Sequence, residues 1–233
     1  MKKFFTLIAA VAMAASMNAQ GTYAVQVGDK VNAGDQITSV ANVTLTYMEN
    51  DGTAFAGGKK TINWADADFT AYVCGVNSGK LVSGAAPTGC VYKFDTKVAG
   101  TLTVAVQLNA EKGLHVLGSD FAEVALASYN LPSAKDGASQ EMTQNAKNEN
   151  IVAVKSNGTI TFNVAAGGTY YVLAAGTKLG FFGFKFTSGT SGISNINASE
   201  AANEGATFNL LGQKVASNAK GLVIKNGKKF INK

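Results

Sequence analysis

Apolar and polar residues alternate with a period of two through most of the chain beyond residue 37. The clearest runs are Val43–Tyr47, Thr101–Leu108 and Ile160–Val164, where every second residue is apolar. Successive side chains of a strand point to opposite faces, so this pattern is typical of strands with one face in a core. Phe182, Phe184 and Phe186 repeat the pattern, and we expect them to share one core-facing side.

Residue pairs that favour tight turns separate these runs. They are Asp51-Gly52, Gly57-Gly58, Ser78-Gly79, Ala99-Gly100, Asn157-Gly158 and Gly167-Gly168. Asn157-Gly158 is the strongest hairpin signal, because both residues accept the positive φ of a two-residue turn. Only the polar stretch Ser133–Asn150 interrupts the pattern, as a long loop or one short helix. Short strands with frequent turns predict an all-β fold, an antiparallel, jelly-roll-like β-sandwich.

The amino-acid composition is consistent with a β-fold and argues against a nucleic-acid partner. Charged residues make up 15% of the chain, against about 25% in a typical soluble domain. All 20 basic residues are lysines. Arginine is the preferred residue for forked contacts to phosphate and guanine, so no nucleic-acid partner is predicted.

The N-terminal segment has the layout of a secretory signal peptide. Lys2 and Lys3 precede the apolar run Phe4–Ala15, and small and polar residues lead to Ala19. The run is shorter than the ~20 residues that a membrane-spanning helix needs. We therefore expect residues 1–19 to be removed, a secreted or cell-surface protein, and no transmembrane segment. Losing the two lysines lowers the formal charge from +5 to +3 (5 − 2).

Cys74 and Cys90 are the only cysteines. Because an exported protein meets an oxidising environment, we predict a disulfide between them. The bond would close a loop of 17 residues (90 − 74 + 1) and contribute about 3 kcal/mol. The alternative is two separate thiols.

Composition changes near residue 188. Residues 20–188 form the predicted β-sandwich domain, residues 189–192 a Gly/Ser/Thr linker, and residues 193–233 a separate small β tail. In the tail, strands are expected around Thr207–Leu210, Leu222–Lys225 and Lys228–Ile231, the last two joined as a hairpin by Asn226-Gly227.

The tail resembles a known family. Phe208–Val215 and Lys220–Phe230 are similar to the last part of the sorting domains that the type IX secretion system reads in secreted Bacteroidota proteins. The positions that carry the match are Gly212, Gly221, Asn226, Gly227, Lys228 and Lys229. The earlier Pro-Asn-Pro-type strand of full sorting domains is missing. The resemblance implies secretion machinery as a partner; the alternative is a remnant hairpin cap.

The central strands also resemble a family, the accessory β-sandwich modules of secreted Bacteroidota proteins. The similar segments are Val43–Met48, Tyr92–Phe94, Gly100–Val104, Gly168–Val172 and Lys178–Phe184. Such modules are often attached to polysaccharide lyases and hydrolases. The resemblance implies glycan binding or spacing.

A catalytic site is not predicted. His115 is the only histidine, and we interpret it as a surface or satisfied side chain. Gly75–Lys80 is one residue short of a phosphate loop, and Leu81 stands where Mg²⁺ needs a hydroxyl. Asp66 and Asp68 share one side of a strand and could act as a glycosidase pair, bind Ca²⁺ or hydrogen-bond a sugar. A solvated strand edge is the simpler interpretation, so no enzyme, metal or cofactor is predicted.

Aromatic residues are the better candidates for binding. A sugar-binding site needs flat apolar rings for pyranose faces and polar groups for hydroxyls. Trp64, with Asp66 and Asp68 close in sequence, is the first candidate, and Tyr72 and Tyr129 are the next. We therefore predict a secreted, non-catalytic module that binds a polysaccharide or a surface partner. The alternative is a structural or adhesive cell-surface protein without a small-molecule ligand.

Overall fold

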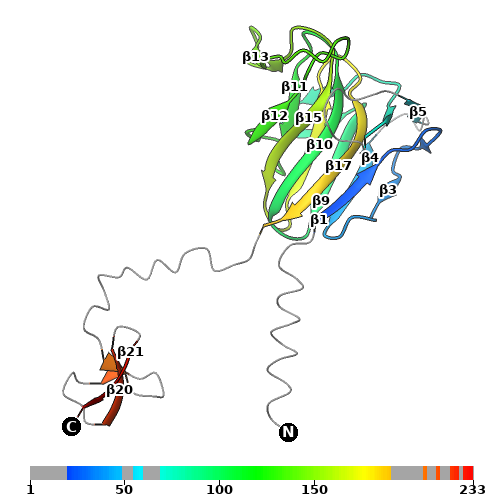
Figure 1. Ribbon diagram of the computed structural model, residues 1–233. Coiled ribbons are helices and arrows are strands. Elements are labelled where there is room, and N and C mark those ends of the chain that lie inside the picture. Colours follow the sequence, from blue (N-terminus) through cyan, green and yellow to red (C-terminus); the bar gives the residue numbers. More distant parts are fainter. Residues whose placement is uncertain are drawn as a thin grey trace. The chain divides into compact units, whose positions relative to one another are not determined.

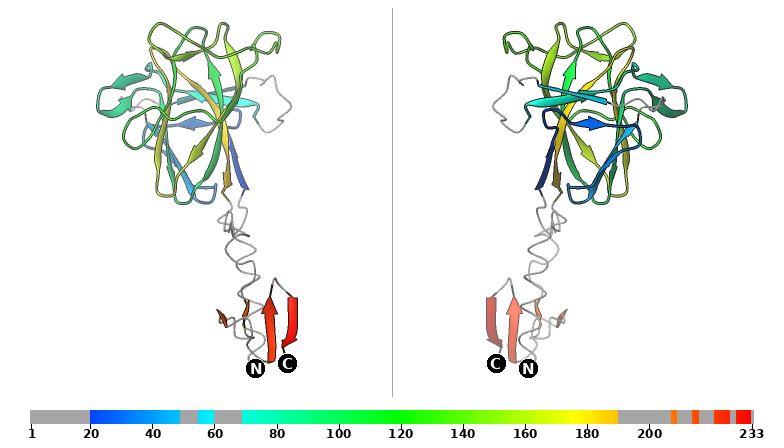
Figure 2. Two further views of the ribbon diagram at one scale, coloured as in Figure 1. Left: turned by 90° about the vertical axis from the view of Figure 1, so that its left-hand side faces the viewer. Right: turned by 90° about the vertical axis from the view of Figure 1, so that its right-hand side faces the viewer.

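The computed structural model describes residues 20–48, 55–59 and 69–189, together with 207–208, 214–215, 221–225 and 228–232. The chain divides into two compact units, Met1–Thr190 and Ser191–Lys233. Every regular element within the described ranges is a strand (Figure 1, Figure 2). This confirms the predicted all-β class. No helix long and apolar enough to cross a membrane occurs among these residues.

The first unit contains two large antiparallel sheets. Sheet A has the order β12-β15-β10-β17-β6-β5-β2, and β1 also pairs with β17. Its strands are β12 (Ser128–Asn130), β15 (Ser156–Val164), β10 (Gly100–Leu108), β17 (Gly180–Ser188), β6 (Ala71–Cys74), β5 (Phe55–Lys59), β2 (Lys30–Val31) and β1 (Gln20–Ala24).

Sheet B has the order β13-β14-β11-β16-β9-β4-β3. Its strands are β13 (Thr143–Gln144), β14 (Asn150–Ile151), β11 (Leu114–Leu117), β16 (Thr169–Ala174), β9 (Val91–Thr96), β4 (Val43–Met48) and β3 (Gln36–Ile37). A separate two-stranded ribbon joins β7 (Lys80–Val82) to β8 (Ala85–Thr88).

The second unit is a small four-stranded sheet of order β19-β18-β20-β21. Its strands are β18 (Thr207–Phe208), β19 (Lys214–Val215), β20 (Gly221–Lys225) and β21 (Lys228–Asn232). Lys225 lies opposite Lys228 in an antiparallel pair, so two residues join β20 to β21. The predicted C-terminal hairpin is confirmed.

The core of the first unit comes from both large sheets. In β4, Val43, Leu45 and Tyr47 are buried and the residues between them are only half-buried. The predicted apolar faces of β10 and β15 are likewise buried in the same cluster. Fully burying a large apolar side chain is worth about 1.5–3 kcal/mol, which accounts for the fixed register of these strands.

The pattern prediction is wrong at β17, because the strand changes phase at Gly183. Phe181, Phe184 and Phe186 belong to the main core, whereas Phe182 packs in a small cluster on the opposite face. Gly183 has φ = 144°, and the pairing of β10 with β17 shifts register between Ala105 and Val106. A bulge of this kind turns the next side chain to the other face.

Two predicted turns are strand residues instead. Gly57-Gly58 lies inside β5, paired with β6. Asn157-Gly158 lies inside β15, opposite Gln107 and Val106 of β10. A Cβ on Gly158 would lie 1.9 Å from the carbonyl oxygen of Asn130, so glycine is needed there for close backbone approach rather than for a turn. The polar stretch 133–150 contains no helix.

Candidate functional site

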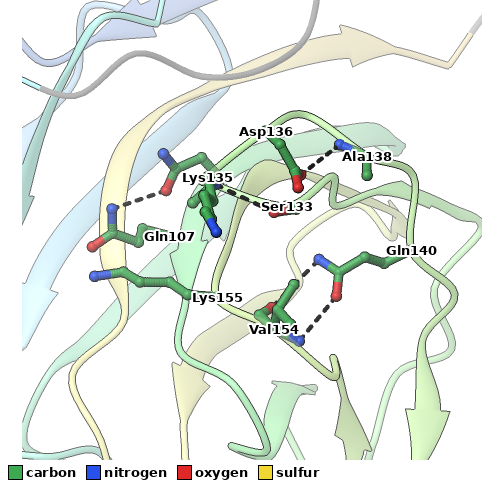
Figure 3. Close-up of a pocket in the computed structure, with 10 residues that line it drawn as sticks. Gln107, Ser133, Lys135, Asp136, Ala138, Gln140, Val154 and Lys155 are labelled. Carbon is green, nitrogen blue, oxygen red and sulfur yellow. Dashed lines mark hydrogen bonds between the residues drawn. The ribbon is translucent and has the colours of Figure 1, made fainter.

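A pocket of about 770 Å³ lies at the end of sheet A where β10 ends and β15 begins. Gln107 of β10 and Asn157 of β15 form its floor. The segment after β12 supplies one wall, with Ser133, Lys135, Asp136 and Gln140. Val154 and Lys155, just before β15, supply another wall (Figure 3).

The floor is a pair of amide side chains on the outward face of sheet A. Gln107 and Asn157 lie directly opposite each other, and Gln107 Nε2 donates a hydrogen bond of 2.8 Å to Asn157 Oδ1. Both residues are largely buried, at 7% and 3% exposure. Amide groups both donate and accept, so this floor matches ligands rich in hydroxyl groups.

Gln140 holds the two walls together. Its Nε2 donates to Ser156 Oγ at 2.6 Å and to the Leu131 carbonyl at 3.2 Å. Its Oε1 accepts a hydrogen bond of 3.0 Å from the Val154 backbone N–H. The backbone adds a bond of 2.8 Å from Ala134 N to the Lys155 carbonyl. The walls are therefore fixed relative to each other before any ligand arrives.

Asp136 is directed toward its own loop. Its Oδ1 accepts a hydrogen bond of 3.1 Å from the Ala138 backbone N–H. The hydrogen bond from Ser133 is the main reason that the pKa of Asp136 lies below its ordinary value, and Lys135 adds a smaller effect. The carboxylate is thus ionised near neutral pH and organises the 133–138 loop.

Tyr72 lies beside the floor. A Cβ on Gly180 would lie 2.8 Å from Gln107 Cβ and 3.1 Å from Tyr72 Cδ2, so the glutamine and the ring are immediate neighbours. The half-buried ring also packs against Phe182, with 5.7 Å between ring centroids. Sheet A therefore places one predicted ligand-binding aromatic next to the polar pocket.

Of the other predicted binding residues, only Tyr129 belongs to the described part of the chain. Trp64, Asp66 and Asp68 lie between β5 and β6 in the sequence, outside the described residues, and their roles stay predictions. Tyr129 lies opposite the core residue Ile160, and hence on the other face of sheet A from Gln107. Its hydroxyl accepts a hydrogen bond of 3.1 Å from Met142 N. The structure does not bring Tyr129 to the pocket.

Sequence reasoning missed most of the pocket. From the sequence, Gln107 is only a polar residue on the outward face of its strand, and Asn157 is predicted to lie in a turn. The polar stretch that begins at Ser133 was the available signal. Nothing in the sequence of that stretch indicates that it packs where β10 ends and β15 begins.

The structure does not contain the predicted disulfide. Cys74 and Cys90 are both thiols, with no disulfide between them. Val73 is in the main core together with Cys90, and Cys74, the next residue of β6, follows on the opposite side of the strand. Cys90 Sγ accepts a hydrogen bond of 3.2 Å from Gly75 N and donates one of 3.3 Å to the Leu179 carbonyl.

His115 is buried rather than exposed. It is 4% accessible, and its Nδ1 contacts the Glu123 carboxylate. Its Nε2 lies 3.6 Å from Glu149 Oε1 and has no hydrogen-bond partner. The imidazole therefore links β11 to two loops. No group of three or more histidine, cysteine or acidic side chains suited to a metal ion occurs in the described part of the chain.

Comparisons with known proteins add little. No protein-family model and no curated protein matches the chain. Among solved structures, it aligns with the crystallographic structure of the Clostridium thermocellum N-terminal endo-1,4-beta-D-xylanase 10B CBM22-1–GH10 modules complexed with xylohexaose. The identity is 16% and the TM-score 0.28, over 82% of this chain and 32% of the other. The chain spans about a third of that structure's length, and so weak a likeness carries no argument.

Proposed function

We propose that the β-sandwich unit is a non-catalytic module whose pocket on sheet A binds part of a glycan chain. The observation that carries the proposal is the amide floor of Gln107 and Asn157 with the Tyr72 ring beside it. Sugars present hydroxyl groups that need donors and acceptors, and apolar ring faces that favour aromatic side chains. The pocket offers the polar groups, and the Tyr72 ring lies next to its floor on the same sheet face.

The charged groups of the pocket favour binding over hydrolysis. Asp136 is the only carboxylate among the described residues that line it. A glycosidase of the usual kind needs two carboxyl groups flanking the scissile bond. Because the Asp136 side chain already accepts hydrogen bonds within its loop, it supports the shape of the pocket.

Calorimetric titration of the full chain with a panel of soluble polysaccharides tests the proposal. We expect saturable binding to one class of glycan. Asn157→Ala and Tyr72→Ala should each weaken it about threefold to tenfold, because each removes a contact worth about 1 kcal/mol. Asn163→Ala is the matched control, since Asn163 is an exposed residue at the far end of the same strand, on the same face.

If no glycan in the panel binds, the proposal is wrong. The structural or adhesive alternative would then stand first. Light scattering at high concentration would test that alternative through self-association of the chain.

Export is a further part of the proposed function. We propose that residues 1–19 direct the chain out of the cytoplasm and that residues 193–233 address it to the secretion machinery. The sequence resemblance of the tail supports this, and its strands form a compact unit of their own. Deleting residues 193–233 in the natural host should leave the protein inside the envelope, as fractionation and immunoblotting would show.

A further inference from the structure

Two lysines at the pocket form no ion pair with an acidic side chain of the described residues. Lys135 and Lys155 are exposed and line the pocket from its two walls. The bond from Ala134 N to the Lys155 carbonyl ties their backbones together. Figure 3 shows both side chains on the Gln107 side of the pocket. Two separate segments thus bring positive charge to one place.

The acidic side chains of the described residues leave the Lys135 and Lys155 ammonium groups able to contact a ligand. Lys93 pairs with Asp95 and His115 with its two glutamates, whereas no described carboxylate forms an ion pair with Lys135 or Lys155. Asp136, the nearest carboxylate in sequence, takes its hydrogen bonds from Ala138 and Ser133. The pocket therefore carries two ammonium groups against one carboxylate that is already hydrogen-bonded.

We infer that the ligand of this pocket is an anionic polysaccharide, whose acidic group lies between Lys135 and Lys155 while its hydroxyl groups face Gln107 and Asn157. This inference rests on the proposed glycan-binding function. A lysine ammonium is a compact charge with three donors, so it suits the carboxylate of a uronic acid and a sulfate ester alike. A neutral glycan would leave the charges at the pocket without a partner.

The test compares matched polymers on the full chain by calorimetric titration. Polygalacturonate is set against its fully methyl-esterified form, and a sulfated galactan against the same galactan after desulfation. We expect the acidic member of one pair to bind about tenfold or more tightly than its neutral counterpart. Raising the salt concentration should weaken that binding, because screening acts on the charged contacts.

Substitutions of lysine test whether the preference for the acidic polymer arises at the pocket. The double substitution Lys135→Gln with Lys155→Gln should abolish the preference for the acidic polymer. The control Lys30→Gln with Lys97→Gln makes the same change in net charge, on β2 and on the connection between β9 and β10. It should keep the preference. Circular dichroism of both double variants should match that of the unchanged chain, since all four lysines are exposed.

The outcomes separate this inference from the proposed function. Equal binding of neutral and acidic polymers would overturn the inference and leave the glycan-binding proposal intact. An equal loss in the control double variant would also overturn it, because overall charge would then explain the preference. If the chain binds none of the four polymers and no neutral glycan either, the result would count against both the inference and the proposed function. Which acidic polymer binds distinguishes carboxylate from sulfate recognition.

Discussion

At the scale of single residues, Cys90 shows how burial changes chemistry. Its side chain is fully inaccessible, and burial is the main cause that raises the pKa of its thiol to about 11. Reactive cysteines are partly exposed and have a lowered pKa, because the thiolate is the nucleophile. Cys90 is therefore a small core side chain with three weak hydrogen bonds rather than a redox group.

The raised pKa predicts a loss of stability in mild alkali. Above the ordinary thiol pKa of 9.0, the unfolded chain releases a proton that the folded chain keeps up to about pH 11. The free energy of unfolding should therefore fall by about 1–1.5 kcal/mol up to about pH 10, which is about half of the roughly 2.7 kcal/mol that the full difference in pKa is worth. Urea titrations at pH values from about 8 to about 10 measure this fall.

Two variants isolate the contribution of Cys90. Cys90→Ala should unfold at lower urea throughout but with a weaker dependence on pH. Cys74→Ala should keep most of the original dependence, because burial raises the pKa of Cys90 more than the neighbouring Cys74 does. An unchanged pH dependence in Cys90→Ala would contradict the assignment. Tyr92, which contacts the Cys90 sulfur, is also buried with a raised pKa. The urea titrations therefore stay at pH values up to the ordinary tyrosine pKa of 10.0, so that the effect of Cys90 is not mixed with that of Tyr92.

At the scale of elements, the crossing at Gly158 decides where β12 can lie. The chain at Asn130 and Leu131 passes so close to β15 that a side chain at position 158 would overlap its backbone. The same passage leads into the loop that forms the pocket wall. One glycine thus sets the separation between strand and wall.

Gly158→Ala should therefore destabilise the first unit by about 1–3 kcal/mol, because backbone atoms cannot move aside as a flexible side chain could. It should also weaken any ligand binding at the pocket. Thermal unfolding followed by circular dichroism measures the first effect. Gly189→Ala is the control, since its added Cβ would meet neighbours only at 3.4 Å or beyond. A melting temperature equal to that of the control would refute the crowding argument.

Strand faces could be predicted from sequence where the strands are regular. Leu45 in β4 and Phe162 in β15 are buried as the alternation predicts. The prediction is wrong at Phe182, because the bulge at Gly183 arises from pairing with β10 and has no local signature beyond the glycine. It is also wrong at Asn157-Gly158, where a distant segment, not a turn, requires the glycine.

The pocket could be predicted only in part, for a related reason. Tyr72 was identified by residue type, which is visible in sequence. The walls depend on tertiary hydrogen bonds such as that of Gln140 with Ser156, which joins residues far apart in sequence and outside regular pairing. The alternation of apolar and polar residues predicts which face of a strand is buried. It does not predict which loop covers the end of a sheet.

At the scale of the whole molecule, the first and last strands of the sandwich unit are neighbours. β1 runs antiparallel to β17, from Gln20 opposite Thr187 to Ala24 opposite Gly183. Tyr23 of β1 donates or accepts a hydrogen bond of 3.2 Å with Tyr47 and packs near Phe184 at 6.0 Å between ring centroids. The N-terminal strand is therefore an integral part of sheet A.

A chain that starts at residue 25 should consequently be less stable than one that starts at residue 20. It lacks β1, leaves part of β17 with open backbone hydrogen-bonding groups, and loses the Tyr23 contacts. We expect a loss of about 2 kcal/mol or more and a tendency to associate through the open edge. Differential scanning calorimetry and size-exclusion chromatography compare the two chains. Identical melting temperatures and elution volumes would argue against the role given to β1.

The pairing of β1 with β17 also sets the order of events when the chain is made. Ala24 leaves the ribosome 156 residues before Gly180 (180 − 24), its partner strand's first residue. At roughly 5–20 residues per second, that interval is about 10–30 s. During it, sheet A lacks a neighbour for its first strand and cannot close. A chain that is still in synthesis, or still crossing the membrane as the proposed export requires, therefore cannot complete sheet A until β17 has emerged.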